Sequence, residues 1–376
     1  MAPLADEDAT EILDGLSRFA RSVLEPAASE IDETGRSATL HLPALASMGI
    51  MGLNLPERLG GIGLRPTVLF EAVARLAGAC ASTASMVTAH WLATDSLLIA
   101  DMAQQEALLR DAAAGRILGA FALTEPNAGS NPAEMTTRAV REESGYHITG
   151  TKQFISNAGE ADFLVVYAKT DMAAGARGIS AFLVERRSEG FRAGPPERTM
   201  GLKGGHVFEV ALDCRVPAEN RLGPEGSGFR TALKVLDAGR VEIAACAVGI
   251  AEAALVAAVS WARQRRVGGK PIGDFQGIQW MLADMATEIE AARQLGLAAA
   301  RKRETGERFS RDASMAKLFA SEMVTRVTDK ALQIHGGYGF TRGLPLERYA
   351  RDSRIFRIYE GSSEIQRNII ARGLLD

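Results

Sequence analysis

The sequence predicts a protein of mixed α and β structure, mainly α, arranged as helices, then strands, then helices. Apolar residues recur every three or four positions in the first and last thirds of the chain, as in amphipathic helices. Between them this period fades, and short apolar runs follow one another with turn residues in between. A chain of 376 residues is too long for one simple core. We therefore expect three domains, at residues 1–118, 119–220 and 221–376.

The first domain, residues 1–118, has a mostly helical pattern. Ala9–Val23 and the apolar Ser82–Ala100 are the clearest helical segments. Leu55–Leu64 is rich in proline and glycine and predicts a loop between them. A helical N-terminal domain is therefore expected.

The second domain, residues 119–220, is predicted to be a sheet. Glu143–Gly145 lies between two alternating runs and signals a hairpin. Several short strands at this spacing favour a small antiparallel barrel or a sandwich. The strand-like runs are Met135–Val140, Tyr146–Ile155, Phe163–Ala168, Ile179–Val184 and Val207–Leu212.

The third domain, residues 221–376, returns to long helices. Apolar residues spaced as on one helix face run from Phe229 to Ala254, and Ile278–Ile289 marks a second helix. Arg311–Ile334 and Asp352–Asp376 would supply a third and a fourth. Four such helices pack naturally as a bundle.

Composition narrows the class of protein. The chain is 47% hydrophobic and 24% charged, with a net charge of −3, so neither nucleic acid nor an anionic membrane is expected as a partner. Cys80, Cys214 and Cys246 are far apart and in no metal spacing, which suits a reducing cytoplasm. The acidic N-terminus does not resemble a signal peptide, and no apolar run is expected to span a membrane. These features indicate a soluble cytoplasmic protein.

Several common chemistries are excluded by their motifs. Gly268–Pro271 has proline where a Walker loop needs Ser or Thr, and Gly337–Gly343 is one residue too long for a dinucleotide fingerprint. No Gly-x-Ser-x-Gly elbow occurs. The five histidines are isolated, so no metal site is expected. A nucleotide cofactor would have to bind outside a Rossmann fold.

The segment Arg354–Ala371 carries the strongest chemical signal. Glu360 follows an alternating apolar run and precedes Gly361, which leaves room for a second molecule near the backbone. Ser363 and Gln366 have the spacing of a capping box at a helix start. A carboxylate held against apolar surface has a raised pKa and can act as a general base near neutral pH. Taken alone, Glu360 also fits a solvated loop glutamate.

Three further segments are unusual for plain structure. Ala122–Asn131 is a turn with small residues and hydroxyls, suited to a flat polar ring or phosphates. Gln333–Phe340 keeps its backbone bare with three glycines. Arg240, in Asp237–Arg240, interrupts an apolar helix stripe, where an unpaired cation would be costly. Each also has a plain reading, as a loop, a helix-capping turn and a snorkelling arginine.

Together these segments resemble the acyl-CoA dehydrogenase family from about Ile50 to Arg372. The segments that carry the resemblance, in the family's order and spacing, are Leu55–Gly63, Leu123–Ser130, Gln333–Gly339 and Ile358–Arg367. The resemblance implies a helical N-terminal domain, a middle antiparallel β-barrel and a C-terminal four-helix bundle. It also implies FAD as cofactor, a homotetramer built as a dimer of dimers, and a role in fatty acid metabolism.

The resemblance assigns the base to Glu360. This residue would remove the α-proton of an acyl thioester while the β-hydride moves to flavin N5, giving a 2,3-enoyl thioester. The Glu360 amide and a flavin hydroxyl would hold the thioester carbonyl. Some members place the base immediately before the helix arginine, but Gly239 stands there, so Glu360 has no rival. Substrate contacts are implied for Ser130, Asp237, Arg240, Tyr359 and Gly361.

The resemblance also implies two groups of cofactor contacts. One lies under and against the flavin ring: Phe121, Leu123, Thr124, Gly129, Ser130, Phe154, Ile155, Ser156, Ser362 and Glu364. The other is supplied by a neighbouring subunit to the pyrophosphate and adenine: Arg265, Gln276, Gln333, Gly336 and Gly337. Binding of FAD and oligomerisation would then be linked.

Three positions depart from the family pattern. Gly268 stands where phenylalanine is usual, Asn131 replaces a common aspartate, and Gly201–Phe208 lacks a Ser-x-Thr element and is one residue short. In relatives the last loop lies near the pantetheine end of the substrate. The acyl carrier could therefore be CoA or a carrier protein.

The resulting prediction is an FAD-dependent acyl-CoA dehydrogenase that passes electrons to an electron-transfer flavoprotein. Alternatives are an acyl or aminoacyl carrier-protein dehydrogenase of a biosynthetic pathway, an acyl-CoA oxidase, and a non-catalytic flavin-binding scaffold. Small residues in Ala81–Ser85 give a mild preference for short or branched acyl chains.

Overall fold

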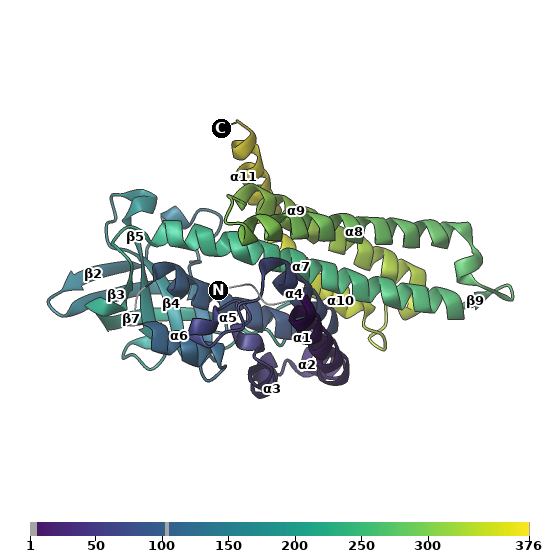
Figure 1. Ribbon diagram of the computed structural model, residues 1–376, viewed down its shortest axis with the longest axis horizontal. Coiled ribbons are helices and arrows are strands. Elements are labelled where there is room, and N and C mark those ends of the chain that lie inside the picture. Colours follow the sequence, from purple (N-terminus) through teal and green to yellow (C-terminus); the bar gives the residue numbers. More distant parts are fainter. Residues whose placement is uncertain (1–5, 102–104, 376) are drawn as a thin grey trace.

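The computed structural model describes residues 6–101 and 105–375. The molecule is elongated, with a sheet at one end and the β9 hairpin at the other (Figure 1). Helix α7 runs from the sheet to the hairpin, α8 and α9 pack alongside it and stop short of the sheet, and α4 and α5 of the N-terminal part pack on α7 (Figure 1). The predicted order of helices, strands and helices is confirmed.

The N-terminal part is helical, as predicted. The predicted helix Ala9–Val23 spans α1 and a π-helical turn, Ala20–Leu24. The predicted helix Ser82–Ala100 is α5, which is buried on nearly all sides and therefore shows no amphipathic face. The α-helices here are α1 (Asp6–Phe19), α2 (Glu25–Thr34), α3 (Leu42–Ser47), α4 (Pro66–Ala79), α5 (Ala81–Ala100) and α6 (Glu106–Ala113).

The middle part is a mixed sheet, and the antiparallel barrel predicted for it is wrong. Both β1 and β2 pair with β4 in parallel. The strand order is β6-β7-β3-β2-β4-β5-β8, with β1 also on β4, and β6 and β8 do not pair with each other in the described chain. Edge strands of three and two residues offer too few hydrogen bonds to close the sheet.

Five of the strands follow the predicted runs, while β1, β6 and β8 were not anticipated because they are too short to show a period. The strands are β1 (Gly119–Ala122), β2 (Arg138–Glu142), β3 (Gly145–Ser156), β4 (Phe163–Lys169), β5 (Ile179–Glu185), β6 (Phe191–Ala193), β7 (Val207–Pro217) and β8 (Arg221–Leu222). The β3–β7 register shifts between Lys152 and Ile155, and Phe154 inside this bulge has φ +56°.

The C-terminal part contains three long helices rather than four. Helix α7 (Gly228–Gln264) packs against α9 (Ser310–His335) and α8 (Gln276–Glu304), and α4 packs on α7 and α8. The predicted fourth helix, Asp352–Asp376, is instead α10 (Leu346–Ser353), a short 3₁₀ turn and α11 (Ser363–Leu375). Glu360 and Gly361 both have positive φ, which a right-handed helix cannot accommodate, so the chain is not helical between the 3₁₀ turn and α11. A hairpin of β9 (Arg266–Val267) and β10 (Lys270–Pro271) joins α7 to α8.

Helix α7 corrects one expectation from the sequence. A window of this helix reaches a mean hydropathy of 2.1, so by length and composition it could cross a membrane. However, 61% of that window is buried inside the protein. The apolar run is explained by the position of α7 in the core.

Candidate functional site

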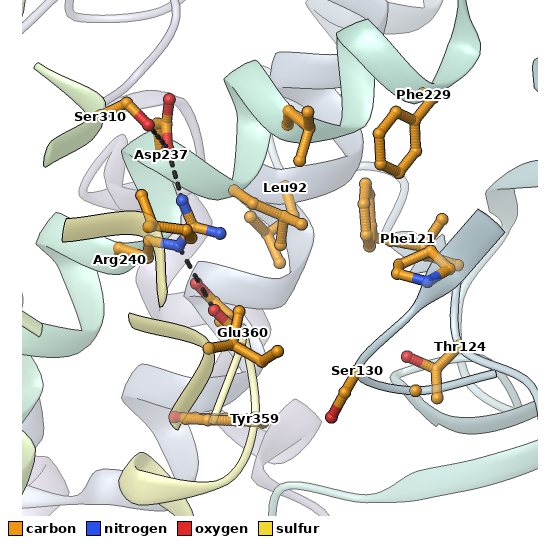
Figure 2. Close-up of a pocket in the computed structure, with 18 of the residues that line it drawn as sticks. Leu92, Phe121, Thr124, Ser130, Phe229, Asp237, Arg240, Ser310, Tyr359 and Glu360 are labelled. Carbon is orange, nitrogen blue, oxygen red and sulfur yellow. Dashed lines mark hydrogen bonds and ion pairs between the residues drawn. The ribbon is translucent and has the colours of Figure 1, made fainter. Parts of the chain in front are cut away.

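A large cavity of about 1110 Å³ lies where the sheet meets the long helices. Figure 2 shows Phe121, Thr124 and Ser130 on its sheet side, opposite Glu360 and Arg240. Helix α5 and the first half of α7 contribute an apolar wall between them. That wall includes Ala89, Leu92, Phe229, Leu233 and Leu236.

Glu360 occupies a strained turn at the edge of this cavity. Its φ of +52° is unusual for a residue with a side chain, and Gly361 follows at +93°. The Oε2 atom of Glu360 is shielded from solvent and has no hydrogen-bond partner among the described residues. Burial raises the pKa of Glu360 to about 7, although the positive charges of Lys317 and Arg240 act in the opposite direction. A solvated loop glutamate is therefore excluded, and the carboxyl has the environment of a general base.

Arg240 is buried and paired beside this turn, so the snorkelling alternative is wrong. Only 3% of the residue is exposed. Its Nη1 atom donates to Asp237 Oδ1 at 2.5 Å, and its Nε atom donates to the Glu360 carbonyl at 3.4 Å (Figure 2). Ser310 donates to the same Asp237 oxygen at 3.0 Å. The arginine thus links α7 to the backbone that carries the carboxylate.

Gly239 provides the space that the carboxyl occupies. A Cβ atom at this position would lie 2.4 Å from Glu360 Oε2 and 2.8 Å from Leu92 Cδ2. Since a Cβ atom essentially never lies within 3.0 Å of such a neighbour, a side chain at 239 and the present position of Glu360 exclude each other. Position 239 is where the resemblance implies the base of some family members, and the structure shows that it is adjacent to the Glu360 carboxyl.

The sheet side of the cavity collects the first predicted cofactor group. Its residues in the cavity are Phe121, Leu123, Thr124, Gly129, Ser130, Phe154, Ile155 and Ser156. The hydroxyls of Thr124, Ser130 and Ser156 make no hydrogen bond to the described residues, so they are free for a ligand. Phe154 remains 63% exposed. This wall therefore offers an aromatic surface and unpaired donors to a flat polar molecule.

A buried ion pair supports that wall from behind. Lys152 is fully buried, and its Nζ atom donates to Glu125 Oε1 at 2.9 Å and to the Leu123 carbonyl at 3.0 Å. Glu125 also accepts from the backbone amides of Thr136 and Thr137. Burial opposes ionisation of Glu125, but Lys152 and these amides outweigh it and hold the pKa at about 2. The loop is thus fixed by a carboxylate that stays ionised.

The remaining predicted cofactor residues lie outside the cavity. Those expected from a neighbouring subunit sit at the end of α7, the start of α8 and the end of α9, far from the sheet (Figure 1). Arg265 there lies 5.9 Å from the Tyr338 ring centre. Neither Ser362 nor the exposed Glu364 lines the cavity. Within one chain, these residues do not complete the site.

Two residues near the base were assigned wrongly or missed. Ser363 does not cap α11, because its hydroxyl donates to Glu322, and the Ile365 amide instead approaches Ser362 Oγ at 3.4 Å. Lys317 was missed, although it interrupts the buried stripe Ala313–Ala320 of α9 as Arg240 interrupts that of α7. The argument that singled out Arg240, that an unpaired cation in an apolar helix stripe is costly, also applies to Lys317 and could have identified it from the sequence.

Comparison with known proteins agrees with this arrangement. The models of the acyl-CoA dehydrogenase N-terminal, middle and C-terminal domains match residues 6–116, 120–214 and 226–375. An acryloyl-CoA reductase (NADH) of Anaerotignum propionicum is 42% identical over 97% of this chain and 94% of that protein. The structure of butyryl-CoA dehydrogenase from Megasphaera elsdenii has a TM-score of 0.97 at 39% identity and covers 100% of both chains. A chain in a structure described as the electron transferring flavoprotein of Acidaminococcus fermentans has a TM-score of 0.97 at 40% identity, again over 100% of both chains.

Proposed function

This chain belongs to the acyl-CoA dehydrogenase family, and we propose that it is an FAD-dependent enzyme that oxidises the Cα–Cβ bond of an acyl thioester. The observation that carries this proposal is the Glu360 carboxyl at the edge of a large cavity, whose Oε2 atom is shielded from solvent and has no hydrogen-bond partner among the residues that the structure describes. A base of this kind opposite an aromatic, donor-lined wall suits removal of a proton beside a flat redox cofactor.

The wall residues fit the ring of FAD. Phe121 and Phe154 offer aromatic surface, and the unpaired hydroxyls of Thr124, Ser130 and Ser156 can meet its polar atoms. When bound, FAD would supply the hydride acceptor. Arg265, Gln276, Gln333, Gly336 and Gly337 would hold the other half of a cofactor bound mainly by a neighbouring subunit, in a homotetramer whose C-terminal helices form bundles.

The protein's own groups would activate the thioester. The backbone amide of Glu360 has no hydrogen-bond partner in the described structure and can donate to the thioester carbonyl, which makes the α-proton more acidic. The Glu360 carboxylate then takes that proton. Arg240 holds the turn through the Glu360 carbonyl, and Leu92 and Leu236 help keep water from the reacting carbons.

The substrate contacts and partners follow from this arrangement. Asp237, Tyr359 and Gly361 line the cavity near the base and Ser130 lines it from the opposite side, and these four residues would contact the thioester and its pantetheine arm. An electron-transfer flavoprotein is the proposed electron acceptor, because a chain of the same fold occurs in a structure described by that name. We place the enzyme in the cytoplasm.

The test is anaerobic bleaching of the flavin by acyl thioesters. The purified protein should be yellow, and a short acyl-CoA should bleach it. Glu360→Gln should abolish bleaching while keeping the flavin, whereas Glu209→Gln, on the exposed face of β7, should behave as wild type. A yellow protein that no thioester bleaches would indicate a scaffold, and bleaching that persists in Glu360→Gln would refute the assigned base.

The same assay separates the other candidates. Bleaching by carrier-protein thioesters alone would indicate a carrier-protein dehydrogenase. Rapid recolouring in air would indicate an oxidase.

A further inference from the structure

The turn that carries Glu360 is held by side chains from three different helices. Gln366 of α11 donates through Nε2 to the carbonyls of Glu360, at 3.1 Å, and Gly361, at 2.8 Å. Lys317 of α9 donates through Nζ to the Gly361 carbonyl at 2.7 Å. Arg240 of α7 adds its bond to the Glu360 carbonyl. Two consecutive residues with positive φ are thus fixed by a clamp of three donors.

Lys317 is the member of this clamp that hydrogen bonding alone does not explain. Its side chain is fully buried and ranks among the largest fully buried side chains of the described protein. Yet Gln366 already donates to the same carbonyl. A buried ammonium is costly compared with a neutral donor, so its charge needs a reason.

We propose that Lys317 is a positioning residue for the base: it fixes the Glu360–Gly361 turn and places a positive charge beside the Glu360 carboxylate. The inference rests on the function proposed above, because it concerns the readiness of that base. With this charge present, the pKa of the Glu360 carboxyl is held to about 7, so that a large share of it is ionised near neutral pH before the thioester arrives. Without it, burial would favour the protonated form, which cannot accept the α-proton.

The other charges around this pair are compatible with that role. Arg240 and Asp237 face the turn from α7 and are paired with each other. The pKa of Lys317 is lowered to about 8, chiefly by burial and further by the positive charge of Arg240. The negative charges of Glu360, Glu322 and Glu364 act in the opposite direction. The negative charge of Glu360 also raises the pKa of Glu242, which is buried on α7. Among the described cations, Lys317 therefore acts on the Glu360 carboxyl more strongly than Arg240, whose charge is paired with Asp237.

The experiment compares Lys317→Met, Lys317→Gln and Lys317→Arg in the full-length flavoprotein. The readout is the pH dependence of anaerobic bleaching by a short acyl-CoA. Loss of the charge should move the acidic limb of that profile upward by about one pH unit in the Met and Gln variants. Lys317→Arg should keep the wild-type midpoint. Lys330→Met, further along the same helix and paired with Asp284 and Glu288, is the matched control and should not move it.

A second readout does not need turnover. Proton uptake is titrated for the wild type and for Glu360→Gln, and the difference reports the carboxyl together with the shift that it causes in Lys317. Repeating this difference in the Lys317→Gln background should show the same upward shift of about one unit. If the midpoint is unchanged in both neutral variants, the proposal is overturned. If Lys317→Met does not fold, the Gln and Arg variants decide it. A wild type that no thioester bleaches would refute the proposed function, while the titration would still test Lys317.

Discussion

Replacing Gly239 with alanine should separate activity from stability. The new Cβ atom would lie 2.4 Å from Glu360 Oε2, whereas ordinary contacts begin at about 3.4 Å, so the carboxyl must move by roughly 1 Å. A misplacement of this size costs on the order of 100-fold in rate, which corresponds to about 2.7 kcal/mol. Alanine also favours the helix by about 1 kcal/mol, which offsets part of the overlap. We therefore expect kcat to fall about 100-fold with the unfolding free energy changed by less than about 2 kcal/mol.

The assay is the rate of anaerobic flavin bleaching at saturating acyl-CoA, measured with the urea unfolding curve of the same preparation. Gly15→Ala in α1 is the matched control, because a Cβ atom there meets only Arg18 Nη2, at 3.9 Å. That variant should keep full activity and gain stability. If Gly239→Ala retains kcat within about threefold of wild type, the carboxyl position inferred here is not the one used in catalysis.

Three further outcomes are expected. The bleaching rate should fall as pH drops below about 7, because the raised pKa of Glu360 leaves the carboxyl protonated there. By linkage, the contribution of Glu360 to folding stability is full below its unfolded pKa and is lost as pH rises through about 7. Glu360→Gln should remove this pH dependence of stability. Lys152→Met should cost about 3–5 kcal/mol in urea unfolding, because Glu125 is left buried without its partner, and adding Glu125→Gln should recover part of that loss; equal stability of the single and double variants would contradict the argument. Phe154→Ala should weaken flavin binding about tenfold in a fluorescence titration, yet leave the unfolding free energy of the flavin-free protein within about 0.5 kcal/mol, since the ring is 63% exposed.

Local patterns predicted the elements well where those elements are long. The period of three and four residues located α7, α8 and α9, and alternation located the five longer strands. Strands β1, β6 and β8 have two to four residues, too few to show alternation, and without them neither the pairing nor the openness of the sheet could be foreseen. The start of α11 at Ser363 was predicted, but its cap was not, because the Ser363 hydroxyl donates to Glu322 of α9 rather than capping its own helix.

The residue types of the chemistry could be read from the sequence: a carboxylate before a glycine, an arginine in an apolar stripe, and a loop of small residues and hydroxyls. Which of these residues come into contact is visible only in the folded chain. Gly239 and Glu360 touch although more than a hundred residues separate them, and Lys317 and Gln366 converge on one turn from two helices. Periodicity reveals which face of a helix is buried, but what that face meets depends on how the helices pack, which is a property of the whole chain.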